Sequence, residues 1–228
     1  MKIKFGALVV AGRGKIGGHV ASRNRAGSYL RTKVTPVNPQ SVDQVGARNR
    51  LAGISSDWRV LTAAQRIAWN AAVADYATTD IFGDIRNPSG FNLHQKLNNN
   101  LVNVAQAQIS APPLPEAVDA FTSLSLAADF TLQTVTVTYA PAIAADHSAI
   151  AFATPAISPG ISFVKSEYRQ YDVLVAADAS PFSNETEYIA KFGPVGAVGM
   201  KVFIKLVQIN WATGQAGIPL TASCIITV

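Results

Sequence analysis

The feature that most constrains the fold is a change in the period of the hydrophobic pattern on the two sides of a proline-rich segment. Before Pro112-Pro113-Leu114-Pro115 the apolar residues recur at the three- and four-residue spacing of helices. After this segment they alternate with polar residues, in the two-residue period of strands. Helices grouped in one half of a chain and strands in the other indicate the α+β class.

A small helical module is predicted for residues 39–111. Two pairs, Ser41 with Gln44 and Thr62 with Gln65, have the spacing of a capping box, in which each side chain bonds the other's backbone N–H. They predict helices over about 41–56 and 63–76, and Leu93, Leu97 and Leu101 mark the apolar stripe of a third helix that follows Ser89-Gly90. Trp58 and Leu61 fall between the first two helices and are expected to hold them together.

An antiparallel β-sandwich of the immunoglobulin or fibronectin type III kind is predicted for residues 119–228, after a short stiff linker at 112–118. The expected strands cover 134–139, 149–152, 161–164, 170–175, 187–192, 200–209 and 222–228. The last two strands, with the turn at 210–215 between them, resemble the closing hairpin of a fibronectin type III module. Because Cys224 is the only cysteine, the disulfide of an antibody domain is excluded.

Residues 1–38 are predicted to form an extended basic arm, with one short strand at 7–11. Glycines interrupt any helical period, and Thr35-Pro36 and Asn38-Pro39 favour extended backbone. Residues 1–50 hold ten Lys and Arg against one acid, Asp43, which gives +9, whereas the rest of the chain sums to −4. Such an asymmetry indicates a segment that contacts an anion.

The anionic partner is left open between nucleic acid and the acidic body of a neighbouring protein copy, because both would use the same basic residues. Two groups of residues are predicted to serve assembly. The arm would dock through Arg13, Lys15, Arg23, Arg25, Tyr29, Arg31 and Lys33. The helical hairpin from which the arm leaves would be held by Trp58, Arg66 and Trp69.

Composition removes several classes of protein. No apolar run reaches the length that spans a bilayer, and the first residues lack the apolar core of a signal peptide. One cysteine excludes a disulfide scaffold and a zinc ribbon. Charged residues make up only 14% of the chain, where about 25% is usual, so part of the surface is expected to be covered by partners.

The candidate catalytic motifs lack the context that their chemistry requires, so no enzyme activity, cofactor or metal is expected. Gly12-Arg13-Gly14-Lys15-Ile16-Gly17 matches the dinucleotide pattern G-x-G-x-x-G, but a poor helix former follows it and basic residues occupy the place of the ribose-binding acid. The three histidines lie in different regions. The carboxylate pairs Asp80/Asp84 and Glu185/Glu187 have no aromatic platform for a sugar.

The stretch from Gly14 to Asn98 resembles a family of small proteins encoded by tailed bacteriophages and prophages, which are presumed virion components. The resemblance is carried by the runs at 17–31, 34–41, 79–83 and 89–92, and by Gln44, Arg48, Trp58, Leu61, Thr62, Gln65, Arg66 and Trp69 between them. It implies a structural role without catalysis, and it transfers no active site.

The expected function is that of a non-catalytic structural subunit of a virion, assembled in the bacterial cytoplasm. Within the particle, a head-associated accessory or decoration protein is favoured over a head–tail or tail protein with an adhesin-like sandwich. Its expected partners are the major capsid protein or sister subunits, in a homo-oligomeric assembly away from any membrane. The alternative is a nucleic-acid-binding protein that uses the same basic arm.

Overall fold

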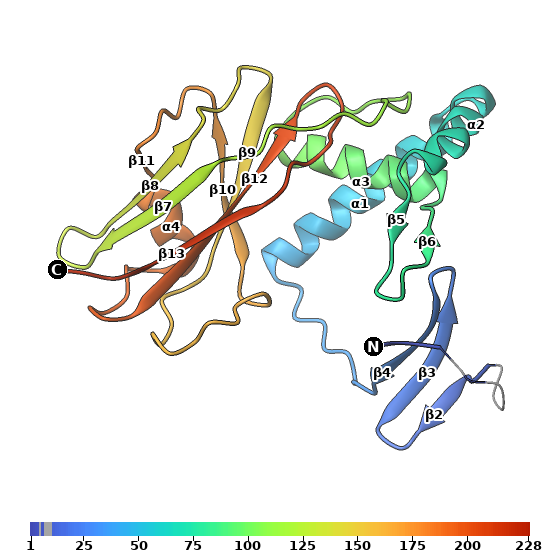
Figure 1. The fold of residues 1–228 in the computed structure, drawn as a ribbon, viewed down its shortest axis with the longest axis horizontal. Coiled ribbons are helices and arrows are strands. Elements are labelled where there is room, and N and C mark those ends of the chain that lie inside the picture. The colour runs from blue at the N-terminus through green and yellow to red at the C-terminus, as the bar shows by residue number, and fades with distance from the viewer. Residues whose placement is uncertain (5, 7–10) are drawn as a thin grey trace. The chain divides into compact units, whose positions relative to one another are not determined.

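A computed structural model describes residues 1–4, 6 and 11–228 of the chain (Figure 1). The chain forms two compact units, residues 1–49 with 77–87 and residues 50–76 with 88–228. Helices and antiparallel sheets occur together, so the predicted α+β class is confirmed. The units divide at places other than the predicted boundaries at 38 and 112–118. Apart from Ala11, the strand expected at 7–11 falls outside the described residues.

The first unit contains a four-stranded antiparallel sheet where an extended arm was expected. Its strands are β1 (Lys2–Ile3), β2 (Gly14–Ile16), β3 (His19–Asn24) and β4 (Gly27–Thr32), in the order β1-β4-β3-β2. The prediction of an arm was therefore wrong for residues 14–32; residues 33–41 have no regular secondary structure.

Glycines that were interpreted as interruptions instead form the turns of this sheet. Gly17-Gly18 joins β2 to β3, and Arg25-Ala26 joins β3 to β4. Gly27 has a φ of +105°, a conformation that side chains with a Cβ rarely adopt. Asn24 Oδ1 accepts a hydrogen bond from Ala26 N at 2.9 Å, which fixes the same turn.

A second, shorter hairpin belongs to the first unit. Its strands are β5 (Thr78–Thr79) and β6 (Ile85–Arg86), which pair antiparallel. The loop between them, residues 80–84, carries both acids of this hairpin, Asp80 and Asp84.

The three predicted helices are present. They are α1 (Val42–Val60), α2 (Ala63–Ala71), which continues into the 3-10 turn Ala72–Ala74, and α3 (Gly90–Asn103). The capping box at Thr62 is complete: Gln65 N donates to Thr62 Oγ1 at 3.3 Å, and Thr62 N donates to Gln65 Oε1 at 2.8 Å. Trp58 lies within the last turns of α1 and not in the connection that follows it.

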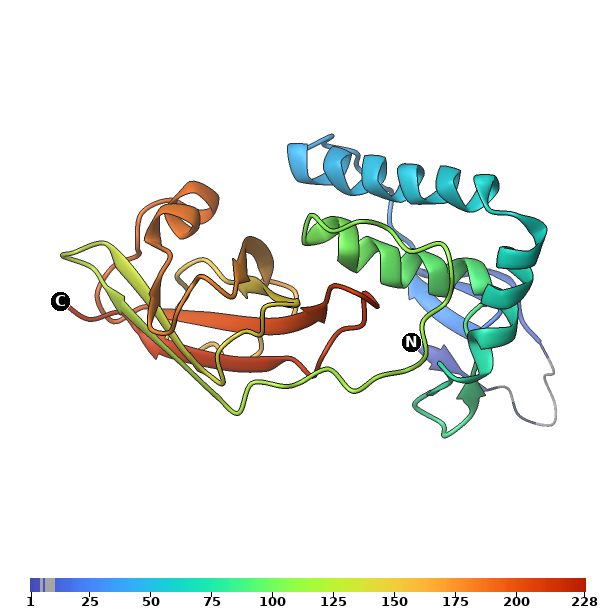
Figure 2. The ribbon, with the colours of Figure 1, turned by 90° about the horizontal axis from the view of Figure 1, so that it is seen from above.

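The helical part of the second unit has its own small core. Trp69, Leu93 and Leu97 are buried together, as the predicted stripe of α3 requires. Figure 2 shows the C-terminal half of α1 alongside α3, where Gln95 Nε2 donates to Ser55 Oγ at 2.6 Å. The segment after α3 is held against this core by a hydrogen bond, which Trp69 Nε1 donates to the Ser110 carbonyl oxygen at 2.9 Å.

Two antiparallel sheets form the rest of the second unit (Figure 1). The strands are β7 (Ser123–Asp129), β8 (Thr134–Ala140), β9 (His147–Ala153), β10 (Arg169–Val175), β11 (Phe182–Ser183), β12 (Lys201–Asn210) and β13 (Leu220–Ile225). One sheet has the order β10-β9-β12-β13 and the other the order β11-β8-β7. Their buried side chains share one hydrophobic core, which includes Val137 and Tyr139 from the three-stranded sheet and Ile204 and Leu206 from the other.

Two expected strands are absent. Residues 161–164 form no strand, and residues 187–192 lie in the helix α4 (Glu185–Phe192). Tyr188 and Phe192 are four residues apart, so both fall on one face of this helix. Tyr188 is buried and donates from its hydroxyl to the Thr154 carbonyl oxygen at 3.0 Å. The helix therefore contributes its apolar face to the core between β8 and β10, the strands that it contacts.

Helix α3 packs against one end of the sheets within the second unit. Val104 is buried with Ile150 of β9 and Ile209 of β12, and Asn100 Nδ2 donates to the Gly214 carbonyl oxygen at 2.8 Å. The segment predicted as a linker is also packed, because Gln215 Nε2 donates to the Leu114 carbonyl oxygen at 2.7 Å. The helices and the sheets thus form one unit without a free linker between them.

Candidate anion-binding surface

The basic residues predicted for arm docking lie on or next to the four strands β1 to β4 of the first unit, which we call the basic sheet. Cross-strand partners in an antiparallel sheet project from the same face. Lys15, Val20 and Arg31 are paired across three strands and form one row of a face. The next row on that face consists of Lys2, Tyr29 and Ser22. The sheet therefore brings Tyr29 close to two of the predicted cations, Lys15 and Arg31.

The remaining predicted cations lie outside this face. Arg23 lies on the opposite face, in a row with Ser28 and Ile3. Arg13 precedes β2, Arg25 lies in the β3–β4 turn, and Lys33 follows β4. All six predicted cations are exposed, and Tyr29 is half-buried.

These cations are not neutralised by ion pairs with the described residues. None of the ion pairs between described residues includes any of the six predicted cations, Arg13, Lys15, Arg23, Arg25, Arg31 and Lys33. The first unit holds ten Lys and Arg against three acids, a net charge of +7, whereas the second unit holds nine against eleven, a net charge of −2. Uncompensated like charges on one small sheet repel one another and attract an anionic partner.

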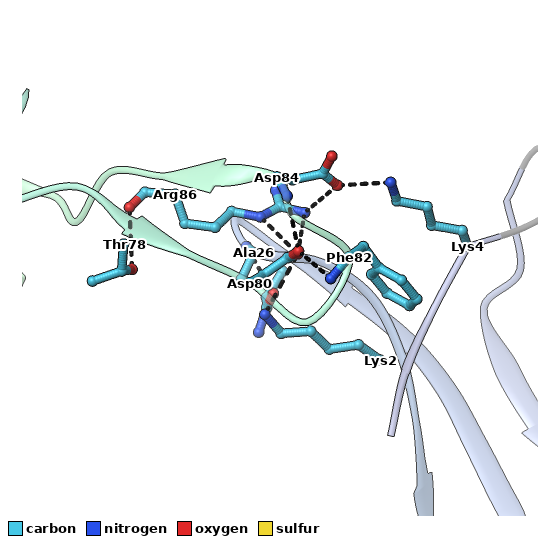
Figure 3. A network of polar contacts seen from close by, with 9 residues as sticks. Lys2, Lys4, Ala26, Thr78, Asp80, Phe82, Asp84 and Arg86 are labelled. Carbon is cyan, nitrogen blue, oxygen red and sulfur yellow. Dashed lines mark hydrogen bonds and ion pairs between the residues drawn. The ribbon is translucent and has the colours of Figure 1, made fainter.

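A second set of cations in the same unit is held by the acids of the β5–β6 loop (Figure 3). The carboxylate of Asp80, whose side chain is only 1% exposed, accepts from Nε and Nη2 of Arg86 at 3.3 and 3.2 Å. Lys2 Nζ lies 3.6 Å from Asp80 Oδ2, and Lys4 Nζ lies 2.9 Å from Asp84 Oδ2. The hairpin of β5 and β6 is therefore tied to β1 by ion pairs.

The Asp80 carboxylate also closes its own turn. It accepts from the backbone N–H of Phe82 at 2.8 Å and of Asp84 at 3.2 Å. Burial by itself would raise the pKa of Asp80, but these two donors, together with Arg86 and Lys2, lower it to about 2. Asp80 is thus a fixed anion that positions the surrounding cations.

A cleft of about 340 Å³ opens beside this network. Its lining includes the cations Lys2, Lys4, Arg23 and Arg86, and the exposed ring of Phe82. The β3–β4 turn forms part of the wall, and a Cβ added at Gly27 would lie 3.3 Å from Arg86 Nη2. The cleft therefore presents four cationic side chains and one aromatic ring to a ligand.

We next consider the other kinds of site that the sequence suggested or excluded, in the part of the chain that the structure describes. No group of three or more His, Cys, Asp or Glu is placed to hold a metal ion, and no helix there is long and apolar enough to cross a bilayer. The glycine motif at 12–17 is followed by strand β3, where a dinucleotide fold requires a helix. Burial raises the pKa of the half-buried Cys224 to about 11, so its thiol stays protonated at neutral pH.

The three residues predicted to hold the helices differ in what they contact. Trp69 is fully buried, and the ring of Trp58 meets those of Phe91 and His94 edge-on, with centroids 5.7 and 5.3 Å apart. Arg66 is exposed, and its side chain makes no hydrogen bond or ion pair with a described residue. A role of Arg66 in holding the hairpin therefore stays a prediction.

The Asp80 network and the cleft were not predicted from the sequence. Lys2 and Lys4 were interpreted as charges of the arm, and Asp80 and Asp84 were considered together as a carboxylate pair. The usable signal was the order Asp80-x-Phe82-Gly83-Asp84 between two short β-branched segments, which is typical of a turn closed by an aspartate side chain.

Comparison of this chain with protein-family models, with curated proteins and with solved structures finds no match.

Proposed function

We propose that the protein is a non-catalytic structural subunit of a bacteriophage virion that docks on an acidic protein partner through its basic sheet. The observation that carries the proposal is the set of six exposed cations between residues 13 and 33, none of which is paired with a described carboxylate. The unlike charges of the two units, +7 and −2, fit subunits that meet by electrostatic steering.

The low content of charged residues, 14%, supports the same proposal, because surfaces buried in repeated subunit contacts are depleted of charge. Within the particle we propose a head-associated accessory or decoration role, with the major capsid protein or a sister subunit as the partner. The resemblance of residues 14–98 to the phage family favours this role over an unrelated assembly.

For the second unit we propose a fibronectin type III-like sandwich that the particle displays. A three-stranded sheet of order β11-β8-β7 facing a four-stranded sheet of order β10-β9-β12-β13 supports this assignment. The antiparallel pairing of β12 with β13 matches the closing hairpin of such a module. The fold by itself does not identify a ligand. We therefore propose that this unit is displayed on the particle, and we assign it no binding role.

A second candidate function is nucleic-acid binding by the basic sheet. The observation in its favour is the position of Tyr29 on one face of the basic sheet. Tyr29 pairs there with Lys2 of β1, and Arg31 lies two residues further along β4 on the same face. An aromatic ring among cations can stack on a base while the cations bind phosphates. A steep fall of DNA affinity with salt would favour this candidate, and no DNA binding at low salt would remove it.

The test of the proposed function reverses the charge of the basic sheet in the intact chain. The variant Lys15→Glu/Arg31→Glu is compared with Arg59→Glu/Arg66→Glu, which makes the same charge change at exposed positions of helices α1 and α2. Each chain is produced during particle assembly, and the particles are isolated on a density gradient. We expect the first variant to be lost from particles and the second to be retained. Equal retention of both would refute docking through the basic sheet.

A further inference from the structure

We propose that the cleft lined by Lys2, Lys4, Arg23 and Arg86 binds the carboxylate side chains of an acidic peptide segment on the partner protein. This inference rests on the proposed function and names the chemistry that the partner presents. The essential group is Arg23, because it lines the cleft and is exposed, and none of the ion pairs between described residues includes it. A guanidinium with all its donors available can bind a carboxylate through two parallel hydrogen bonds.

The other three cations are held in place before a ligand arrives. Arg86 uses Nε and Nη2 on Asp80, which leaves Nη1 available. Lys2 is 3.6 Å from the same carboxylate, and Lys4 is fixed by Asp84. Because these side chains are already ordered, binding costs little of the side-chain entropy that free lysines would lose.

The charge of the cleft fits a short acidic peptide better than a nucleic acid. Its four cations and the two acids that position them, Asp80 and Asp84, leave a net charge of +2. Two carboxylates would neutralise this charge. A nucleic-acid strand carries one negative charge per nucleotide along its whole length, which is more than the net charge of this cleft can neutralise.

The aromatic wall adds a second requirement on the ligand. Phe82 is 43% exposed in the cleft, and Lys4 Nζ lies 5.2 Å from the centre of its ring. An apolar side chain between two acidic ones would cover this ring while its neighbours reach the cations. We therefore expect a segment with the pattern acidic–apolar–acidic.

The experiment measures binding of a fluorescein-labelled peptide with the sequence Gly-Glu-Leu-Glu-Gly to the full chain by fluorescence anisotropy. The control peptide carries Gln in place of both Glu. Arg23→Gln removes the unpaired cation of the cleft, and Arg59→Gln is the matched change at an exposed arginine of helix α1 that does not line the cleft. Arg23→Lys restores the charge without the two-donor geometry.

We expect Arg23→Gln to weaken binding of the acidic peptide about tenfold, as loss of a charge-assisted hydrogen bond predicts. Arg59→Gln should change it less than about twofold, as expected for a charge outside the site, and Arg23→Lys should recover part of the affinity. The inference is overturned if the glutamine peptide binds equally well, or if Arg59→Gln weakens binding as much as Arg23→Gln. It is also overturned if a single-stranded oligonucleotide displaces the peptide from the cleft at physiological salt.

Two further measurements distinguish loss of binding from loss of structure, and the cleft inference from the proposed function. The backbone amide signals of Phe82 and Asp84 in NMR spectra report whether Arg23→Gln leaves the Asp80 turn intact. Particle incorporation of the same variants separates this inference from the proposed function. If the chain joins particles while Arg23→Gln has no effect on incorporation or on peptide binding, the cleft inference fails and the proposed function stands.

Discussion

Asp80 and Arg86 make the closest contact between two side chains of the β5–β6 hairpin, with Nε and Nη2 of Arg86 at 3.3 and 3.2 Å from Oδ2 of Asp80. The same carboxylate accepts two backbone hydrogen bonds from its own loop and faces Lys2 of β1. One acid therefore connects a loop, a strand of its hairpin and a strand of the basic sheet. The shape of the cleft depends on this carboxylate staying ionised.

The change Asp80→Asn tests this dependence. An amide in place of the carboxylate keeps the size of the side chain but removes the charge that holds Arg86 and Lys2. We expect the amide hydrogens of Phe82 and Asp84 to exchange faster with solvent, and affinity for the acidic peptide to fall. The control Asp84→Asn removes a carboxylate that is 42% exposed and should have a smaller effect on exchange. Unchanged exchange rates in Asp80→Asn would contradict the central role of Asp80.

Protonation of His94 is expected to weaken the second unit in acid. His94 is 1% exposed, its Nδ1 is buried without a partner among the described residues, and its ring meets those of Trp58 and Trp69. Burial lowers the pKa of His94, and the charge of Asp57 opposes this only in part. As pH falls below about 6.5, the ordinary pKa of histidine, the unfolded chain gains a proton that the folded chain does not, so the free energy of unfolding decreases.

The measurement for this prediction is urea unfolding of the wild type and of His94→Gln between pH 8 and pH 5. The wild type should lose stability toward pH 5 more steeply than the variant, since the other two histidines remain in both proteins. If the two proteins show the same dependence on pH, His94 is not the group responsible.

Leu97→Ala should be strongly destabilising, because Leu97 is 1% exposed and belongs to the small core of the helices. Cavity formation at such a site costs about 2–5 kcal/mol. The matched control is Ile67→Ala on α2, a side chain that is 68% exposed, for which a change within about 0.5 kcal/mol is expected. Thermal or urea unfolding measures both; a cost below about 1 kcal/mol for Leu97→Ala would contradict the packing described here.

Gly214→Ala tests the contact between the β12–β13 loop and α3. Gly214 has a φ of +67°, and an added Cβ would lie 2.4 Å from the Leu97 carbonyl oxygen. Both the backbone conformation and the clash oppose the change, so we expect a loss of more than about 1 kcal/mol in the free energy of unfolding. Gly160→Ala, where an added Cβ would meet nothing within 4 Å, should be close to neutral. A near-neutral Gly214→Ala would contradict the close packing of this loop on α3.

The helices were predictable because their signals are local. The capping box of Thr62 with Gln65 and the leucine spacing of α3 each lie within one or two helical turns. Helix α4 was predicted as a strand because Tyr188, Ala190 and Phe192 alternate over a run too short to separate the two periods. Strand β7 was missed although Leu124, Leu126 and Ala128 alternate, since its small residues carry little hydrophobic signal.

The candidate site was only partly predictable for a different reason. The basic residues are evident from charge alone, but their division between two faces of a sheet depends on the strand register, which two short turns set. The cleft needs β5 and β6, which lie more than 40 residues beyond the basic sheet. A local sequence pattern carries no information about contacts between segments so far apart in the chain. The ion pair between Asp80 and Lys2 could therefore not be predicted from the sequence.

The most direct test of the central claim is whether the chain is part of a particle. Particles released by the bacterial culture that carries the gene are purified on a density gradient, and each fraction is analysed by quantitative mass spectrometry. We predict that the chain sediments with the particles at a fixed ratio to the capsid protein, and that high salt releases it. Recovery of the chain only in the soluble fractions at the top of the gradient would contradict the structural role.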